Sequence, residues 1–263
     1  SFPKFVIDNL DKYRKAGLIG GTKMKTMKER MQEEHSGTYD EMYMYDVYSL
    51  EDKDIRNKVI VDIGANFGFF SFRCLEMGAK KCYCFEPQSD NYKKIDEFGF
   101  KEKIDAKKLA VLDGSVSEVV MGGKDVFSNI WGQGDSNKVK CISFQEAFSY
   151  VKENQDLVLK VDCEGSEFEI IFNSPPEILK RFSFMYIEIH DDMNPNYKGR
   201  MEDLIKYIED LGFIQEKHGP QFGMFWADGS FTPSPIKCIR FRRKAEASLP
   251  DGWFGEEDVS VYK

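Results

Sequence analysis

The sequence predicts an α/β fold with a mostly parallel sheet that helices cover on both faces. From residue 58 onward, short runs rich in valine, isoleucine and phenylalanine alternate with amphipathic stretches of helical length. Alternating strands and helices form parallel sheets with helices on each side. The 263 residues, of which 41% are hydrophobic, suffice for one large core. We therefore expect an α/β domain at residues 51–263, preceded by a helical or lid-like extension at residues 1–50.

The composition limits the partners of the chain. A net charge of −8 leaves little positive charge to neutralise phosphates, which makes nucleic acid an unlikely partner and argues against anionic membranes. The sequence contains no run of 18 apolar residues. Six scattered cysteines form no pair of zinc-binding motifs, so we expect free thiols in a reducing compartment and a cytoplasmic location.

The first 50 residues are expected to form two short helices. Phe5, Leu10 and Tyr13 mark the first, and methionines at helical spacing mark the second. Four tyrosines between residues 39 and 48 then precede the first strand. Packing in the core explains such aromatic residues at least as well as contact with a ligand.

The rest of the chain shows clear boundaries between elements. Gly78 and Pro87 end a helix and a strand, and Ser143 with Glu146 fits a capping box that starts a short helix. The predicted strands are 58–62, 81–86, 106–112, 157–161, 184–190, a hairpin of 213–218 with 222–227, and 236–242. The predicted helices are 67–77, 89–98, 143–151, 166–172 and 199–211.

A glycine-punctuated loop, Asp-Ile-Gly-Ala-Asn-Phe-Gly, follows the first strand of the sheet. Such a loop lets a ligand approach the backbone closely, at the edge of the sheet where α/β proteins bind ligands. The carboxylate of Asp62 would repel the pyrophosphate of NAD. It suits a ligand with an amino group and a sulfonium, so we expect S-adenosylmethionine as the cofactor.

Acidic residues also end the other predicted strands. Glu86 lies 24 residues after Asp62, a suitable distance for hydrogen bonds to ribose hydroxyls. Asp162 and Glu164 follow the strand 157–161, whereas Glu167 can be explained by its place at a helix N-terminus. A divalent metal such as magnesium could also bind Asp162, Glu164, Glu188 and Asp191, although the sequence does not show that they converge.

His190 is the candidate catalytic base. It follows Glu188 at the end of the strand 184–190, and acidic neighbours raise the basicity of a histidine. We expect Asp162 or Glu188 to orient either His190 or the acceptor. A hydrogen-bonded structural histidine is an equally good interpretation.

Four segments together resemble the FkbM family of S-adenosylmethionine-dependent methyltransferases. They are VIVDIGANFGFFS at 59–71, FEP at 85–87, LKVDCEGSEFEII at 159–171 and IEIHD at 187–191, with Cys163 standing where the family often has an aliphatic residue. The resemblance implies a class I methyltransferase (Rossmann-like) domain with a seven-stranded sheet whose last strand is antiparallel. It implies O-methyl transfer, commonly to sugar or polyketide hydroxyls. The cofactor-binding residues expected on these grounds are Asp62, Gly64, Ala65, Asn66, Gly68, Glu86, Pro87, Ala110, Val111, Asp162 and Glu164.

We therefore expect an O-methyltransferase that acts on a hydroxyl of a sugar or glycan. Another small-molecule hydroxyl or RNA is an alternative acceptor, and the net charge counts against RNA. A noncatalytic binding module with the same fold and a nicotinamide oxidoreductase are further alternatives. The sequence leaves the acceptor, metal dependence and oligomeric state open.

Overall fold

A seven-stranded sheet forms the centre of the protein. The computed structural model describes residues 26–97, 102–121, 137–218, 223–225, 231–233 and 236–244. The strand order is β3-β2-β1-β7-β8-β12-β9, and neighbouring strands from β3 to β8 are parallel. The last strand, β12, inserts between β8 and β9 and runs antiparallel to both. This arrangement confirms the predicted class I methyltransferase sheet.

The structure bounds each element as follows. The strands are β1 Val59–Ile63, β2 Lys81–Phe85, β3 Ile104–Lys107, β4 Ala110–Leu112, β5 Glu118–Met121, β6 Asn137–Ser143, β7 Leu157–Val161, β8 Phe182–His190, β9 Phe213–His218, β10 Gly223–Phe225, β11 Phe231–Pro233 and β12 Ile236–Arg243. The helices are α2 Met27–Glu34, α3 Ser36–Tyr43, α4 Asp52–Ile55, α5 Phe69–Glu76, α6 Ser89–Glu97, α7 Phe144–Phe148, α8 Glu167–Asn173, α9 Pro176–Leu179 and α10 Met201–Asp210.

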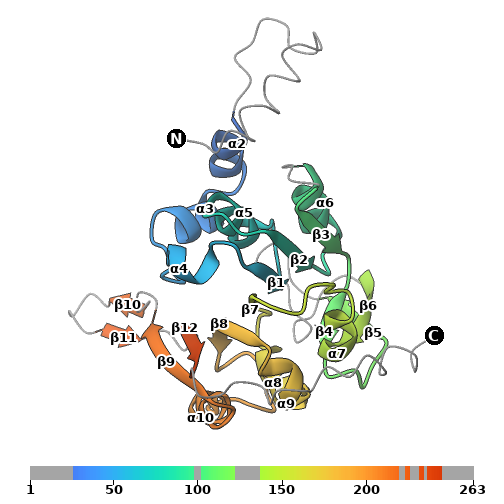
Figure 1. The fold of residues 1–263 in the computed structure, drawn as a ribbon, viewed down its shortest axis with the longest axis vertical. Coiled ribbons are helices and arrows are strands. Elements are labelled where there is room, and N and C mark those ends of the chain that lie inside the picture. The colour runs from blue at the N-terminus through green and yellow to red at the C-terminus, as the bar shows by residue number, and fades with distance from the viewer. Residues whose placement is uncertain are drawn as a thin grey trace, which may run out of the picture.

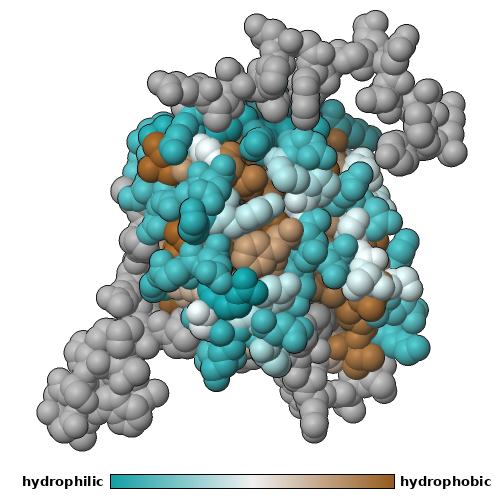
Figure 2. Space-filling model, turned by 90° about the horizontal axis from the view of Figure 1, so that it is seen from below, coloured by the Kyte–Doolittle hydropathy of each residue, from teal (hydrophilic) through white to brown (hydrophobic). Residues whose placement is uncertain are grey.

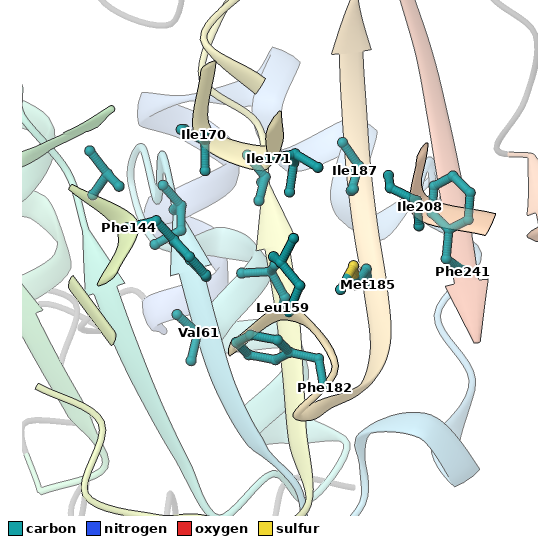
Figure 3. Close-up of a cluster of buried hydrophobic side chains, with 14 of the residues drawn as sticks. Val61, Phe144, Leu159, Ile170, Ile171, Phe182, Met185, Ile187, Ile208 and Phe241 are labelled. Carbon is teal, nitrogen blue, oxygen red and sulfur yellow. The ribbon is translucent and has the colours of Figure 1, made fainter. Parts of the chain in front are cut away.

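Helices cover both faces of the sheet, as expected. Figure 1 shows α5 and α6 on one side of it and α8 and α10 on the other. Side chains alternate along each strand, so Val61 and Leu159 pack with α8 and α10, whereas Ile60 and Val158 pack with α5. Figure 3 shows the first of these clusters, in which Ile170 and Ile171 of α8 lie over the strands. Two separate apolar cores, one on each face, therefore hold the central strands β1, β2, β7 and β8.

Two predicted strand assignments are wrong. The expected strand 106–112 is split, because β3 joins the main sheet while β4 pairs with β6 in a three-stranded sheet that also contains β5. The expected hairpin of 213–218 with 222–227 does not form. Instead β9 pairs with β12, and β10 pairs with β11 in a two-stranded sheet. In both cases the local apolar pattern correctly predicts extended chain. Segments distant in the sequence decide which strands pair.

The segment before the sheet packs on α5. Met31, Met42 and Tyr48 are buried in the same cluster as Phe70 and Phe72. Helix α2 begins with a capping box formed by Thr26 and Glu29. The predicted helix with Phe5, Leu10 and Tyr13 lies outside the described residues, as do Met24 and the side chain of Met27, and the boundary at residue 50 stays a prediction.

The surface, the cysteines and the helix lengths can be compared with what the composition predicts. Figure 2 shows one face on which hydrophobic atoms form separate patches among hydrophilic ones. All six cysteines are free, and all but Cys163 are buried. Within the described part of the chain, no helix is both long and apolar enough to cross a membrane.

A buried arginine anchors the inserted strand β12. Arg240 is 2% exposed, and its guanidinium lies 2.8 Å from Asp54 and 2.9 Å from both Glu51 and Glu216. Asp54 is fully buried and also accepts a hydrogen bond from the Tyr186 hydroxyl at 3.0 Å. Arg240 therefore joins β12 to β9, to α4 and to the residue preceding α4.

Replacing Arg240 by alanine is expected to destabilise the protein by about 3–5 kcal/mol, because Asp54 would remain buried without its cation. Urea unfolding of the two proteins measures the difference. Arg242→Ala is the matched control, since Arg242 pairs with Glu216 but is 38% exposed and should cost below about 1 kcal/mol. Equal losses for the two variants would contradict this account of Arg240.

Candidate functional site

Two loops at the carboxyl ends of β1 and β7 touch back to back. Gly64 has a φ of +76°, and a Cβ at this position would lie 1.8 Å from the backbone oxygen of Asp162. Only glycine fits such an approach. In each loop a non-glycine residue is also left-handed, Asn66 with φ 52° and Glu164 with φ 52°. Strain of this kind concentrates at ligand sites, and both residues face the cavities described next.

The first cavity lies above β1 and β2. Its wall is formed by the glycine loop, the end of β2, β4 and the loop after β7. Every predicted cofactor residue on β2 and β4 lines it. The cavity is lined by Ile63, Gly64, Asn66, Phe85, Glu86, Pro87, Gln88, Asn91, Leu109, Ala110, Val111, Leu112, Met121, Asp162, Cys163, Glu164 and Ser166.

Glu86 is held in place inside this cavity. Its two carboxylate oxygens accept hydrogen bonds from the backbone N–H groups of Asn66 and Gln88, each at 2.7 Å. Burial nevertheless raises the pKa of Glu86 to about 8. A carboxylate oxygen has more than one lone pair, so both oxygens can still accept hydrogen bonds from a ligand.

A second cavity, of about 620 Å³, lies between α3, the glycine loop and the ends of β7 and β8. It shares Asn66, Asp162 and Glu164 with the first cavity, so the two meet at these residues. It is lined by Glu34, His35, Ser36, Gly37, Thr38, Glu41, Met42, Val47, Tyr48, Ala65, Asn66, Phe67, Phe69, Phe70, Lys160, Asp162, Glu164, Glu188, His190, Met193 and Ile236.

Asp62 lies beneath the loop rather than in either cavity. It is fully buried, and its carboxylate accepts a hydrogen bond from Ser71 of α5 at 2.7 Å and lies 3.3 Å from Lys160 Nζ. The alternation of side chains along β1 points Asp62 toward α5, not along the strand toward the site. Gly68 also lines neither cavity and begins α5.

Lys160 connects the two loops. Its ammonium donates to the carbonyl oxygen of Gly64 at 2.5 Å and lies 3.3 Å from both Asp62 and Asp162. Although burial alone would lower the pKa of Lys160, the two carboxylates outweigh burial and raise it. Burial alone would raise the pKa of Asp162, but Lys160 and His190 hold it below its usual value. Asp162 is therefore ionised at neutral pH.

His190 is oriented by Glu167. The Nδ1 atom of His190 lies 3.1 Å from Glu167 Oε1, and the fully buried Glu167 also accepts the N–H groups of Cys163 and Gly165. Glu167, held by these two N–H groups, can accept the Nδ1–H of His190 and fix the orientation of its ring. The Nε2 atom then lies 3.6 Å from Glu164 Oε2. Burial lowers the pKa of His190, but its carboxylate neighbours outweigh burial and raise it to about 10.

Tyr48 reaches the site from the segment before the sheet. Its hydroxyl oxygen lies 2.9 Å from Asp162 Oδ2 and 3.0 Å from Glu188 Oε2. Burial and the charge of Asp162 raise the pKa of Glu188 to about 7. Burial also raises the pKa of Glu164 to about 8. In the absence of a ligand, several of these carboxyl groups hold protons near neutral pH.

The sequence identified most, but not all, of this site. Glu86, Asp162, Glu164, Glu188 and His190 were predicted, and the structure places all five at the cavities. Lys160, Glu167 and Tyr48 were missed as site residues. A lone lysine within the apolar strand 157–161 was a signal for the first. Glu167 was read as a helix-terminal acid, and nothing distinguished Tyr48 from its neighbouring tyrosines.

Two of the predicted metal ligands, Asp162 and Glu164, come close together with the predicted base His190. One ligand atom each from Asp162, Glu164 and His190 lies within 4.8 Å of the others, a set that a divalent cation could bind. Asp191, in contrast, caps α10 by accepting the N–H of Met201 at 2.8 Å and lines neither cavity. Asp191 therefore does not join the other carboxylates that the sequence offered as possible magnesium ligands.

Comparison with known proteins places the chain among methyltransferases. Residues 62–214 match the Methyltransferase FkbM domain family. No curated protein matches the sequence. Similar solved structures include methyltransferase FkbM from Methylobacillus flagellatus (12% identity, TM-score 0.46). The match covers 82% of this chain and 52% of that one, so this chain spans about half of it.

Two further solved structures are similar to this chain at low identity. One is TrmK of M. capricolum with S-adenosylhomocysteine (13% identity, TM-score 0.41, covering 73% of this chain and 66% of that one). The other is an rRNA methylase from Streptococcus thermophilus (13% identity, TM-score 0.44, covering 76% of this chain and 93% of that one).

The ligand-free protein is expected to lose stability as the pH rises from about 5 to 10. The folded pKa values of Glu86, Glu164 and Glu188 lie above the ordinary glutamate value of 4.5, and the pKa of His190 lies above the ordinary histidine value of 6.5. The folded state therefore binds more protons than the unfolded state, so its stability falls through the window from 4.5 to 8 for the glutamates and from 6.5 to 10 for His190.

Thermal unfolding should show a decrease in Tm of at least about 5 °C between pH 6 and pH 9. Glu86→Gln is the control, because glutamine does not titrate and should reduce the slope below pH 8. A Tm that stays constant or rises over this range would contradict the assigned protonation states.

Proposed function

The chain belongs to the Methyltransferase FkbM domain family, and from this premise we propose that it transfers a methyl group from S-adenosylmethionine to a hydroxyl of a sugar or glycan. The observation that carries the proposal is the pair of cavities that meet at Asn66, Asp162 and Glu164. Methyl transfer requires two ligands to meet end to end. The shared residues mark the point where they would do so.

The first cavity suits the nucleoside part of the donor. Glu86 offers free lone pairs to ribose hydroxyls, and the apolar side chains of β4 offer a surface for the adenine ring. At the shared end, Asp162 and Glu164 suit the positively charged methionine part. S-adenosylmethionine, when bound, supplies a methyl group on a positively charged sulfur.

Asp62 enters this proposal as a positioning residue. Its carboxylate lies 3.3 Å from Lys160, whose ammonium binds the Gly64 carbonyl. It supports the donor loop from below, whereas the sequence suggested direct contact with the donor. Gly68 contributes in the same indirect way by starting α5.

His190 is proposed as the general base for the acceptor hydroxyl. The hydroxyl oxygen would form its bond to the methyl carbon as the bond from that carbon to the donor sulfur breaks, with the electron pair left on the sulfur. The hydroxyl proton would pass to Nε2, while Glu167 holds Nδ1–H and stabilises the imidazolium that results. In the ligand-free protein His190 already carries this proton. A positively charged donor beside Asp162 and Glu164 lowers the proton affinity of His190 and favours its neutral form.

The charges of the second cavity support a neutral, hydroxyl-rich acceptor. Five acidic residues line it, and its two strongest cations, Lys160 and His190, are already paired with carboxylates. Phosphate would therefore meet more negative than positive charge. This counts against RNA as the acceptor.

A methyl-transfer screen with S-adenosylmethionine tests the proposal. Free sugars, glycans, small alcohols and RNA serve as acceptors, each with and without EDTA. Transfer to sugars that survives EDTA supports His190 as base. Transfer that EDTA abolishes favours a metal at Asp162, Glu164 and His190, and transfer to RNA alone overturns the acceptor class.

Replacing Glu86 by glutamine is expected to weaken S-adenosylmethionine binding by roughly 10–100-fold, since it replaces one of two accepting oxygens by an NH2 group that can accept neither from the backbone nor from a ribose hydroxyl. Isothermal titration calorimetry measures the dissociation constant. Glu97→Gln, at the end of α6 and outside both cavities, should bind like the wild type. Unchanged affinity of Glu86→Gln would remove Glu86 from the donor site.

Replacing His190 by glutamine is expected to reduce turnover by about 10²–10⁴-fold while donor affinity stays near that of the wild type. The wild-type rate should rise with pH as His190 loses its proton. Glu167→Gln should move this rise to lower pH, because the charge of Glu167 raises the pKa of His190. A Glu167→Gln profile that coincides with the wild-type profile would rule out the orienting role, and full activity of His190→Gln would rule out the base.

A further inference from the structure

We infer that Tyr48, Asp162 and Glu188 form the recognition site for the acceptor, and that this site takes a compound with two neighbouring hydroxyl groups and no phosphate. The inference rests on the proposed function and narrows its substrate class. It also assigns Tyr48 as a positioning residue, which the sequence did not reveal.

One hydroxyl group holds two carboxyl groups together. Tyr48 Oη lies within hydrogen-bond distance of both Asp162 Oδ2, at 2.9 Å, and Glu188 Oε2, at 3.0 Å. Tyr48 is 6% exposed, and its ring packs edge-on against Phe70 and Tyr186, so its position is fixed by the core. Asp162 and Glu188, which come from different strands, must therefore lie side by side.

The bridge uses little of the hydrogen-bonding capacity of the two carboxyl groups. A tyrosine hydroxyl has one proton and can donate to only one of its two neighbours at a time. Asp162 also lies 3.3 Å from the Lys160 ammonium through the same oxygen that faces Tyr48.

Both carboxyl groups retain oxygens that can only accept. Within the described residues, Asp162 Oδ1 has no hydrogen-bond partner, and besides Tyr48 the Glu188 carboxyl receives the weakly donating Cys238 thiol. Asp162 and Glu188 also line the second cavity, with Asp162 at its junction with the first. The bridge thus presents two acceptors side by side at the point where methyl transfer would occur.

Two adjacent hydroxyl groups match this arrangement. Each can donate one hydrogen bond, one to Asp162 and the other to Glu188, which holds the compound at the junction of the cavities and leaves a further hydroxyl to give its proton to His190. A phosphate has only acceptor oxygens at neutral pH and would face acceptors on both sides. An acceptor with a single hydroxyl would leave one of the two carboxyl groups without its partner.

Acceptor binding to protein saturated with S-adenosylhomocysteine tests the inference. The probes are methyl glycosides of glucose, mannose and galactose, the corresponding monodeoxy sugars, and glucose 6-phosphate, measured by calorimetry and, with S-adenosylmethionine, by methyl transfer. At least one glycoside should bind, and removing one hydroxyl of the recognised pair should weaken its binding at least about 10-fold, whereas glucose 6-phosphate should not bind.

Tyr48→Phe should raise the acceptor KM at least about 10-fold while the dissociation constant of S-adenosylhomocysteine changes less than about twofold. Tyr45→Phe is the matched control, because Tyr45 is 62% exposed and lines neither cavity. If Tyr48→Phe does not fold, Glu188→Ala removes the second carboxyl group and should raise the acceptor KM in the same way.

Four results would overturn the inference: no glycoside binds, every deoxy sugar binds as well as its parent, glucose 6-phosphate binds more tightly than the glycosides, or Tyr48→Phe leaves the acceptor KM unchanged. The proposed function fails differently. In that case the wild-type protein does not bind S-adenosylhomocysteine at all.

Discussion

The buried ammonium of Lys160 is the interaction on which the arrangement of the site depends. Asp62 and Lys160 lie opposite each other in neighbouring strands, on the face of the sheet that α5 covers. From there Lys160 binds the Gly64 carbonyl and lies beside Asp162. One cation therefore pairs with the fully buried Asp62 and the half-buried Asp162 and fixes the glycine loop to the end of β7. Without it, Asp62 would keep only the hydrogen bond from Ser71, and no cation would stand between the two carboxylates.

Beyond Lys160 the site holds more acidic than basic groups. Glu164 and Glu188 respond by taking up protons, and His190 responds by keeping one. Such a site is suited to a ligand that brings positive charge, because the ligand replaces protons that the protein otherwise has to bind. The same excess of acidic groups is expected to lower the stability of the ligand-free protein at high pH. It also favours a positively charged sulfonium donor and disfavours a phosphate.

Much of this could be predicted, because the signals were local. Buried strands, the glycine loop and the acids at strand ends follow from residues close together in the sequence, and the capping box of Ser143 and Glu146 is present as expected. The features that could not be predicted depend on residues that are distant in the sequence. The direction of Asp62 follows from the parity of its position in β1, the pairing of β9 follows from the insertion of β12, and the role of Glu167 follows from the end of β8 lying beside it. No local pattern contains this information.

The two cavities also differ in where their walls come from. Every residue that lines the first cavity lies between Ile63 and Ser166, within the segment that matches the family. The wall of the second includes residues 34–48 and Ile236, which lie outside that segment. Under the proposed function, the methyl donor therefore binds within the segment that matches the family. One side of the proposed acceptor cavity is formed by residues outside that segment. Tyr48 is the point where the two parts meet, because a flanking side chain there sets the spacing of two carboxyl groups that belong to the shared fold. Under the proposed function, substitutions in the flanking wall would alter the acceptor cavity and leave the lining of the first cavity unchanged.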